Sequence, residues 1–227
     1  MKTLDENQKI AWLIEPSREV WDSLIHHPFP RDLAAGILPL ETFRYYLAQD
    51  NHYLEDFLRT VGLLVAKAAT SELRRFAVTL LQDTLTGELA MHEAIERDFP
   101  FSGDCPINNV TYAYGDFLLR QAYQGSDCEI LTALAPCVVS YRLIARRLSI
   151  DPVKDLPAAY QLWLDSYRGE AYGALVERFL TLLDERLSGQ VREQRERARL
   201  IFRKACDFEF LFWEESYRGR LRFMVKD

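Results

Sequence analysis

The sequence contains few of the residues that mark metal-binding, disulfide-rich or nucleic-acid-binding proteins. Among its 227 residues there are only four cysteines and four histidines, and no two cysteines form a C-x-x-C pair. This argues against a zinc or thioredoxin-type site, and in a reducing cytosol the cysteines are expected to be free thiols. The formal net charge of −6 disfavours a nucleic-acid partner, because phosphate backbones are also negative.

Long apolar runs are missing as well. The apolar stretch at 61–69 is interrupted by Gly62 and Lys67, and the N-terminus is polar with charges of both signs. Neither a signal peptide nor the roughly 20 apolar residues that span a bilayer is recognisable. We therefore expect a soluble, cytoplasmic protein that does not bind a membrane.

Helical periodicity dominates what is present, and no alternating strand or hairpin turn interrupts it. Without a repeat, a linker or a shift in composition, residues 1–227 are expected to form a single all-α domain, a bundle of about seven to eight helices. Polar residues predicted as helix N-caps are Thr70 or Ser71, Asp127 and Asp155. The expected helical segments are 5–26, 41–69, 71–98, 108–123, 128–149, 155–167, 169–187 and 190–218.

Two carboxyls fall on the apolar sides of predicted helices. Asp50 shares a stripe with Leu47 and Tyr53. A buried ionised carboxylate is costly unless it has hydrogen-bond partners, so Asp50 is either a satisfied structural residue or part of a site. Glu209 faces aromatic neighbours such as Phe212, which should raise its pKa toward that of a proton carrier. The alternative for Glu209 is a structural carboxylate paired with an arginine.

Cys137 is the one cysteine with a setting that suggests reactivity. Pro136 precedes it and is expected to kink the helix or to start a new one. A helix N-terminus near the sulfur would favour the thiolate, which is the reactive form. The alternative is a small core residue.

Several tyrosines occupy inward-looking positions near these groups. They are either ordinary core residues or the lining of a pocket for a flat, polar heteroaromatic ligand. The candidates are Tyr53, Tyr112 or Tyr114, Tyr141 and Tyr167.

Metal and haem sites have less support. Glu88 and His92 are four residues apart on one helix, as metal ligands can be, but no Glu-x-x-His pair is present. His26 or His27 could ligate haem, although a histidine that interacts with the dipole at a helix C-terminus explains the same position. We expect neither a metal nor a cofactor.

Four blocks of sequence, taken in order, resemble a known family. The first block, at 20–54, contains His-Pro-Phe, Leu-Pro and Gln-Asp-x-x-Tyr. The others are TYAYGDFLL at 111–119, APCVVSY at 135–141 and FEFLFWEESY at 208–217. Together they resemble the TenA (thiaminase II) family, within the haem-oxygenase-like helical fold, and Cys137 points to its cysteine-containing branch.

The resemblance implies a role for each candidate. Asp50 would hold the amino group and the adjacent ring nitrogen of a 4-aminopyrimidine, Cys137 would be the nucleophile, and Glu209 would carry the proton. The residues that would line the ring are Tyr53, Tyr114, Tyr141 and Tyr167, with Tyr112 as the alternative to Tyr114.

The resemblance also implies an activity and an assembly. Family members hydrolyse thiamine or aminopyrimidines from degraded thiamine, and they release hydroxymethylpyrimidine for thiamine salvage. They are commonly homotetramers, so we expect a hydrolase acting on C–N bonds that forms a homo-oligomer, a tetramer or a dimer.

Some features leave other functions open. Arg142, Arg146 and Arg147 follow Cys137 on the same helix and could mark an acidic substrate. An oxidase that resembles the pyrroloquinoline-quinone synthesis protein C is one alternative, although more histidine and arginine would be expected in its cavity. A ligand-binding or regulatory protein without catalysis is another, and a haem-binding protein is a third.

Overall fold

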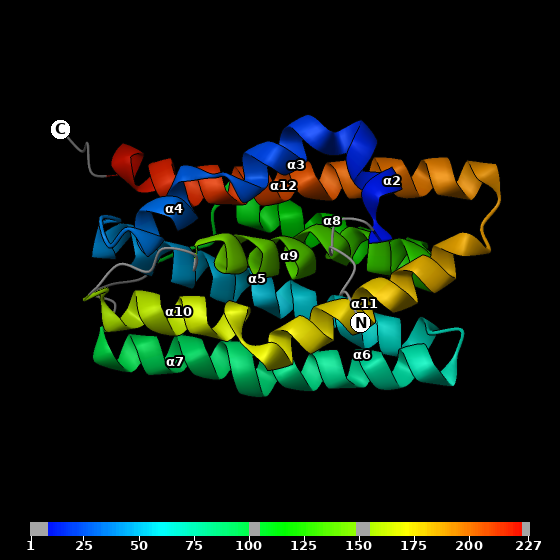
Figure 1. Ribbon diagram of the computed structural model, residues 1–227, viewed down its shortest axis with the longest axis horizontal. Coiled ribbons are helices and arrows are strands. Elements are labelled where there is room, and N and C mark those ends of the chain that lie inside the picture. Colours follow the sequence, from blue (N-terminus) through cyan, green and yellow to red (C-terminus); the bar gives the residue numbers. More distant parts are fainter. Residues whose placement is uncertain (1–8, 100–104, 149–154, 224–227) are drawn as a thin grey trace.

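The computed structural model describes residues 9–99, 105–148 and 155–223, and all regular elements within these ranges are helices (Figure 1). The predicted all-α class is therefore confirmed. Short elements open the described chain: α2 (Ala11–Ile14), η1 (Glu15–Ser17), α3 (Arg18–Ile25) and α4 (Pro28–Ala34). The others are α5 (Leu40–Lys67), α6 (Ser71–Asp83), η2 (Thr84–Glu88), α7 (Leu89–Asp98), α8 (Asn109–Gln124), α9 (Asp127–Leu148), α10 (Ala158–Arg168), α11 (Glu170–Ser188) and α12 (Arg192–Phe223).

The helices form a bundle with α9 near its middle (Figure 1). Along one long side α12 runs beside α3, and along the opposite side α6 and α7 follow one another. Contacts join α5 to α8 and α6, and they join α9 to α12, α11 and α10. Large aromatic side chains fill the core between them, among them the fully buried Trp21, Trp163 and Trp213.

Helix α9 corrects one prediction made from the sequence. Pro136 lies inside α9, which continues from Asp127 to Leu148, so no helix N-terminus forms beside Cys137. Helix α9 is buried over most of its length, and packing from several sides offsets the hydrogen bond that proline removes.

The same helix corrects the expectation about membrane spans. By length and composition α9 is long and apolar enough to cross a bilayer. Most of it, however, is buried inside the bundle, and the core helix of a soluble protein passes the same test.

The segment predicted as one helix at 71–98 contains a local irregularity. Five residues, Thr84–Glu88, form a π-helical turn (η2) between α6 and α7. A π turn widens the helix by one residue and rotates the face that follows it, and such turns are frequent at functional sites. Here the turn brings Glu88 into a partly buried position.

Helix caps agree with the sequence at one position and differ at another. The hydroxyl of Thr70 accepts a hydrogen bond from the backbone N–H of Leu73 at 3.1 Å, so Thr70, rather than Ser71, caps α6. Asp155 is not the cap of α10, because Pro157 holds that position.

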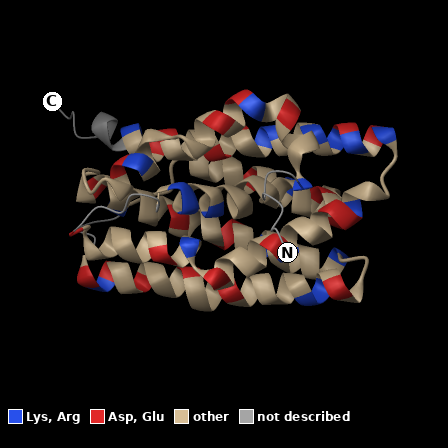
Figure 2. Ribbon diagram, viewed as in Figure 1, with Lys and Arg blue, Asp and Glu red and all other residues tan. Residues whose placement is uncertain are grey.

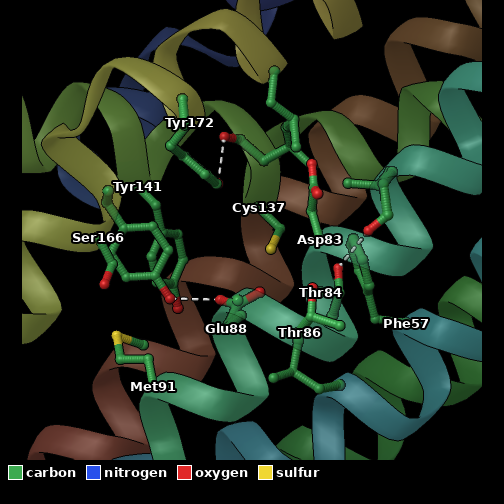
Figure 3. A pocket seen from close by; sticks show the side chains of 17 residues that line it. Phe57, Asp83, Thr84, Thr86, Glu88, Met91, Cys137, Tyr141, Ser166 and Tyr172 are labelled. Atoms are coloured by element: carbon green, nitrogen blue, oxygen red, sulfur yellow. Dashed lines mark hydrogen bonds between the residues drawn. The ribbon is translucent and has the colours of Figure 1, made fainter.

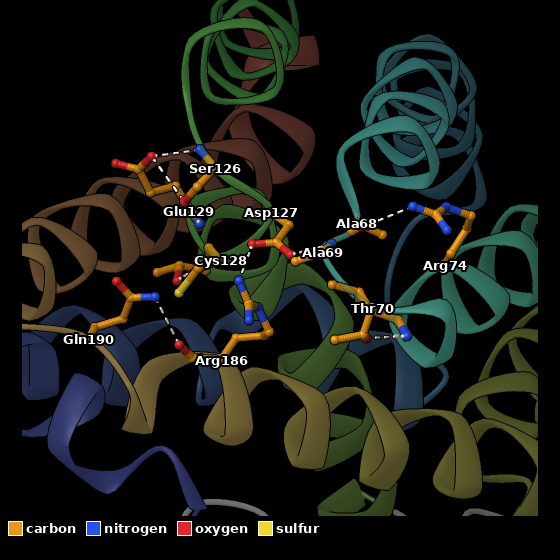
Figure 4. Close-up of polar contacts among 12 residues, drawn as sticks. Ala68, Ala69, Thr70, Arg74, Ser126, Asp127, Cys128, Glu129, Arg186 and Gln190 are labelled. Carbon is orange, nitrogen blue, oxygen red and sulfur yellow. Dashed lines mark hydrogen bonds and ion pairs between the residues drawn. The ribbon is translucent and has the colours of Figure 1, made fainter.

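Asp127 was predicted as an N-cap and has a different role (Figure 4). Ser126 and Glu129 form a capping box instead, in which the Ser126 N–H donates to Glu129 Oε2 at 2.8 Å and the Glu129 N–H donates to Ser126 Oγ at 3.4 Å. Asp127 is buried and accepts from the Ala69 N–H and from Arg186, both at 2.9 Å. It therefore ties the end of α5 and the helix α11 to the start of α9.

Charged side chains lie mainly on the outside of the bundle (Figure 2). They are dense along the first half of α12, where Arg199 pairs with Glu196 and Arg203 pairs with Asp207. Pairs spaced three or four residues apart on an exposed helix face stabilise it weakly and keep the surface hydrated.

Candidate functional site

A cavity of about 350 Å³ lies between the α6–η2–α7 segment and helices α5, α9, α10 and α11 (Figure 3). Its wall is mostly apolar, with Phe57 and Met91 among the lining side chains. Polar side chains of the wall include Glu88, Cys137 and Tyr167. The volume and the few polar groups suit a single small molecule.

The candidate residues fall into two groups around this cavity. The cavity wall includes Cys137, Tyr141 and Tyr167. The other four candidates are buried, each no more than 3% exposed, and do not form part of the wall: Asp50, Tyr53, Tyr114 and Glu209. Tyr112, the alternative to Tyr114, is 57% exposed and so faces away from the core.

Asp50 is held by Tyr46, one turn earlier on α5, and Tyr46 in turn contacts side chains of two other helices. The Tyr46 hydroxyl donates to Asp50 Oδ2 at 3.0 Å and accepts from Trp163 Nε1 at 3.1 Å. The Tyr141 hydroxyl lies 3.3 Å from that of Tyr46, so a chain of polar contacts links the cavity wall to Asp50. Burial, followed by the negative charge of Glu88, raises the pKa of Asp50 well above its usual range.

His92 completes the surroundings of Asp50. Its Nδ1 lies 2.7 Å from the amide oxygen of Asn51, an acceptor, so Nδ1 carries the proton and the lone pair on Nε2 faces Asp50 Oδ2 at 3.5 Å. Burial lowers the pKa of His92 to about 4, which keeps the ring neutral. Glu88 and His92 therefore have separate partners, and the described part of the chain contains no group of three or more potential metal ligands.

Glu209 has the environment that the sequence predicted. Tyr114 donates to Glu209 Oε2 at 2.8 Å, and this tyrosine stacks on Phe208 with ring centroids 5.4 Å apart. Burial raises the pKa of Glu209 to about 7, while the hydrogen bond from Tyr114 opposes the rise. The partner of this carboxyl is thus a tyrosine, whereas the structural alternative required an arginine.

The environment of Cys137 is the reverse of the predicted one. Its side chain faces the cavity, but burial and the negative charges of Glu209 and Glu88 raise the pKa of the thiol well above its usual range. The expectation of a thiolate favoured by a helix N-terminus is wrong, because α9 continues through this position. At rest Cys137 is a neutral thiol, and a base must remove its proton before it can act as a nucleophile.

Glu88 is a site residue that the sequence suggested only as a metal ligand. The Tyr167 hydroxyl donates to Glu88 Oε1 at 2.5 Å, and Glu88 faces the same space as Cys137 (Figure 3). Glu88 is four residues from the buried His92 and so shares the inward face of the helix. This spacing was the signal in the sequence that could have identified Glu88 as a residue of the cavity. Tyr46 and Tyr172 were also missed, and Tyr172 lines the cavity while its hydroxyl donates to a carbonyl of α9 at 3.0 Å.

The two neighbouring histidines have structural partners. His27 caps α4 by accepting from the Phe29 N–H through Nδ1 at 3.1 Å, and its Nε2 donates to Glu214 at 2.9 Å. Both nitrogens are therefore in use, which disfavours haem ligation. His26 ends α3 with Nδ1 at 2.8 Å from the carbonyl oxygen of Asp22.

The three arginines that follow Cys137 do not line the cavity. Arg142 donates to the backbone carbonyls of Tyr167 and Gly169 at 3.1 and 2.9 Å. Arg147 donates to the carbonyl at the end of α3 at 2.8 Å. The expectation that Arg142, Arg146 and Arg147 mark an acidic substrate is therefore not supported by their positions.

These features define an all-α protein with one small cavity that is lined by a thiol, and with several buried carboxyls around it. The chain belongs to the TENA/THI-4/PQQC family, whose model matches residues 15–219. An aminopyrimidine aminohydrolase from Helicobacter pylori is 27% identical over 217 residues, which is 93% of this chain and 100% of that protein.

Solved structures of the same family have the same fold. A TenA homologue from P. horikoshii OT3 is 30% identical with a TM-score of 0.82, over 93% of this chain and 99% of that one. A protein described as a TenA family transcription regulator, from Silicibacter sp. TM1040, is 29% identical with a TM-score of 0.84, over 92% of this chain and 96% of that one.

Proposed function

We propose that the protein is an aminopyrimidine hydrolase of the thiaminase II kind. It releases 4-amino-5-hydroxymethyl-2-methylpyrimidine from thiamine or from its degradation products, for thiamine salvage. The observation that carries the proposal is the Cys137 thiol in the wall of one small cavity, together with two carboxyls, Asp50 and Glu209, that are buried in the core outside that wall. Besides burial, the negative charges of Glu209 and Asp50 raise the pKa of the Cys137 thiol, and that of Glu209 raises the pKa of Asp50, which supports a shared role for the three groups.

The names of relatives support this function. The H. pylori relative and a second one from Bacillus subtilis, 27% identical over 88% of this chain and 86% of that protein, are both called aminopyrimidine aminohydrolases. The proposal also follows from the residue types, since the reaction requires a soft nucleophile and a proton carrier.

Asp50 would recognise the pyrimidine. An aminopyrimidine presents an N–H donor beside a ring-nitrogen acceptor. A carboxyl whose pKa is raised can accept from the amino group with one oxygen and donate its own proton to the ring nitrogen. Asp50 lies behind the cavity wall, and Tyr141, which belongs to the wall and contacts Tyr46, connects the two regions.

Cys137 and Glu209 would carry out the bond exchange. Glu209, as a carboxylate, takes the proton of the Cys137 thiol, and the thiolate adds to the pyrimidine ring. The ring electrons then expel the amine from the CH₂ group, and Glu209 returns the proton to it; with thiamine the thiazole leaves as a neutral molecule, and Glu209 releases its proton to solvent. Water adds to the CH₂ carbon and gives a proton to Glu209. The thiolate then leaves the ring and is protonated again by Glu209, so the enzyme ends as it began.

A pKa of about 7 suits Glu209 to this cycle, because both protonation states are accessible near neutral pH. The neutral Cys137 thiol makes the nucleophile dependent on this carboxyl. An oxidase resembling the pyrroloquinoline-quinone synthesis protein C is less well supported, because no histidine or arginine of the described residues lines the cavity.

We also propose that the protein is cytoplasmic and forms a homo-oligomer, a tetramer or a dimer, as family members commonly do. A ligand-binding protein without catalysis remains the competing function. It would keep the pocket but would not need the Cys137 sulfur.

The test is a turnover assay with 4-amino-5-aminomethyl-2-methylpyrimidine and with thiamine, in which release of the hydroxymethylpyrimidine is followed by chromatography. We expect release by the wild type and its loss in Cys137→Ser. Cys128→Ser is the matched control, since Cys128 is a buried thiol on the same helix that does not line the cavity. If neither substrate is turned over by the wild type, the hydrolase assignment is wrong.

A further inference from the structure

The cavity wall has an uneven charge. Two carboxylates reach it, Glu88 on the π-helical turn and Asp83 at the end of α6, and no lysine or arginine of the described chain lines it. Asp83 is exposed and also borders a second, outer hollow between α6 and α11, where Arg75 and Arg178 balance the charges of Asp83 and Glu72. The charged side chains of the inner cavity are therefore all acidic, and a cationic ligand is favoured there.

Glu88 is placed to contact a ligand directly. One carboxylate oxygen accepts from Tyr167, and the structure assigns no partner among the described residues to the other. Tyr167 is itself fixed by packing on Tyr141, with ring centroids 4.8 Å apart. The π turn thus presents a carboxyl of defined position in the same cavity as the Cys137 sulfur. Burial raises the pKa of Glu88, and a cationic ligand beside it would favour its ionised form. The proposed mechanism gives this carboxyl no task.

We propose that Glu88 binds the positively charged leaving end of the substrate, the ammonium of an aminomethylpyrimidine or the thiazolium of thiamine. This inference rests on the proposed function and names the part of the substrate that the described mechanism leaves unrecognised. Glu88 would favour cationic leaving groups, and it would disfavour substrates in which that end is neutral or carries a phosphate.

Binding to a protein that cannot turn the ligands over tests the proposal. In the Cys137→Ser background, calorimetry at pH 7 would measure the affinity for 4-amino-5-aminomethyl-2-methylpyrimidine and for its neutral 5-hydroxymethyl counterpart. Glu88→Gln should weaken binding of the cation roughly tenfold or more, as loss of a hydrogen bond to a charged group does, and change binding of the neutral ligand by less than about twofold.

Two further variants separate charge from structure. Tyr167→Phe removes the hydrogen bond that orients Glu88 but keeps the carboxylate, so the preference for the cation should persist even if both affinities fall. Asp83→Asn removes the exposed carboxylate, and solvent screening should limit its effect on the preference to about threefold. Circular dichroism of each variant would verify that it is folded.

Three outcomes would overturn the inference. Equal weakening of both ligands by Glu88→Gln would mean that Glu88 only supports the fold of the site. An unchanged affinity for the cation would mean that it makes no contact. If the parent protein binds neither pyrimidine, the proposed function itself fails and the assignment of Glu88 falls with it, a result that differs from the other two.

Discussion

Glu209→Gln should stabilise the protein at alkaline pH while it abolishes turnover. Burial raises the pKa of Glu209 from an ordinary value of 4.5 to about 7 in the folded state. Between these values the folded protein binds a proton that the unfolded chain releases. The free energy of unfolding therefore falls as the pH rises from about 4.5 to about 7. Above that pH the ionised, buried carboxyl destabilises the folded state by a constant amount.

The size of this destabilisation follows from the difference between the pKa values of Glu209 in the unfolded and folded states. About 1.4 kcal/mol per pH unit gives a cost of about 3 kcal/mol above pH 7. Glutamine is neutral at every pH and its carbonyl oxygen can still accept from Tyr114. We therefore expect Glu209→Gln to be more stable than the wild type by up to about 3 kcal/mol at pH 8, with little difference at pH 4.5.

Chemical unfolding in urea at a series of pH values measures this effect. The matched control is Glu185→Gln on α11, an exposed glutamate whose replacement should leave the pH dependence unchanged. If Glu209→Gln is less stable at pH 8, or if its difference from the wild type does not depend on pH, Glu209 is not a buried carboxyl with a raised pKa.

Two other predictions follow from named contacts. Tyr114→Phe removes the hydrogen bond that favours ionised Glu209. In the wild type kcat/KM should rise with pH near pH 7, and in this variant the rise should occur about one pH unit higher. Tyr112→Phe, at an exposed position, should not shift the profile, and equal shifts in both variants would contradict the assignment. Asp127→Ala leaves Arg186 and the Ala69 N–H without their acceptor. The free energy of unfolding should fall by about 2 kcal/mol and Tm by several degrees. Ser126→Ala, which removes one helix cap, is the milder comparison and should cost about 1 kcal/mol. Thermal unfolding followed by circular dichroism would measure this difference, and an Asp127→Ala variant as stable as Ser126→Ala would refute it.

Much of the fold could be predicted from the sequence because the apolar stripes follow the helical period. The inward positions of Asp50 and Glu209 were predictable for the same reason, since each stands three, four or seven residues from buried neighbours. Tyr46 shows where this method stops. The helical period identifies Tyr46 only as an apolar residue of the stripe, whereas in the structure its hydroxyl donates the hydrogen bond that Asp50 accepts.

The failures share a physical cause, which is dependence on tertiary packing or on irregular geometry. Pro136 carries a strong local signal against helix continuation, but the packing of α9 outweighs it. The π turn at Thr84–Glu88 departs from the helical period, and a search based on that period cannot find it. The role of Asp127 depends on α5 and α11, which are distant in sequence.

The order in which the parts of the site lie along the chain has a consequence during synthesis. Every described residue of the cavity wall lies between Leu54 and Leu175, whereas Glu209 is on α12, the last of the described helices. A chain that leaves the ribosome from its N-terminus can therefore gather the pocket and the Cys137 thiol before its proton carrier exists. Only when α12 has been synthesised can Glu209 join the Cys137 thiol beside the cavity. An incomplete chain would therefore carry the thiol but not the carboxyl that activates it.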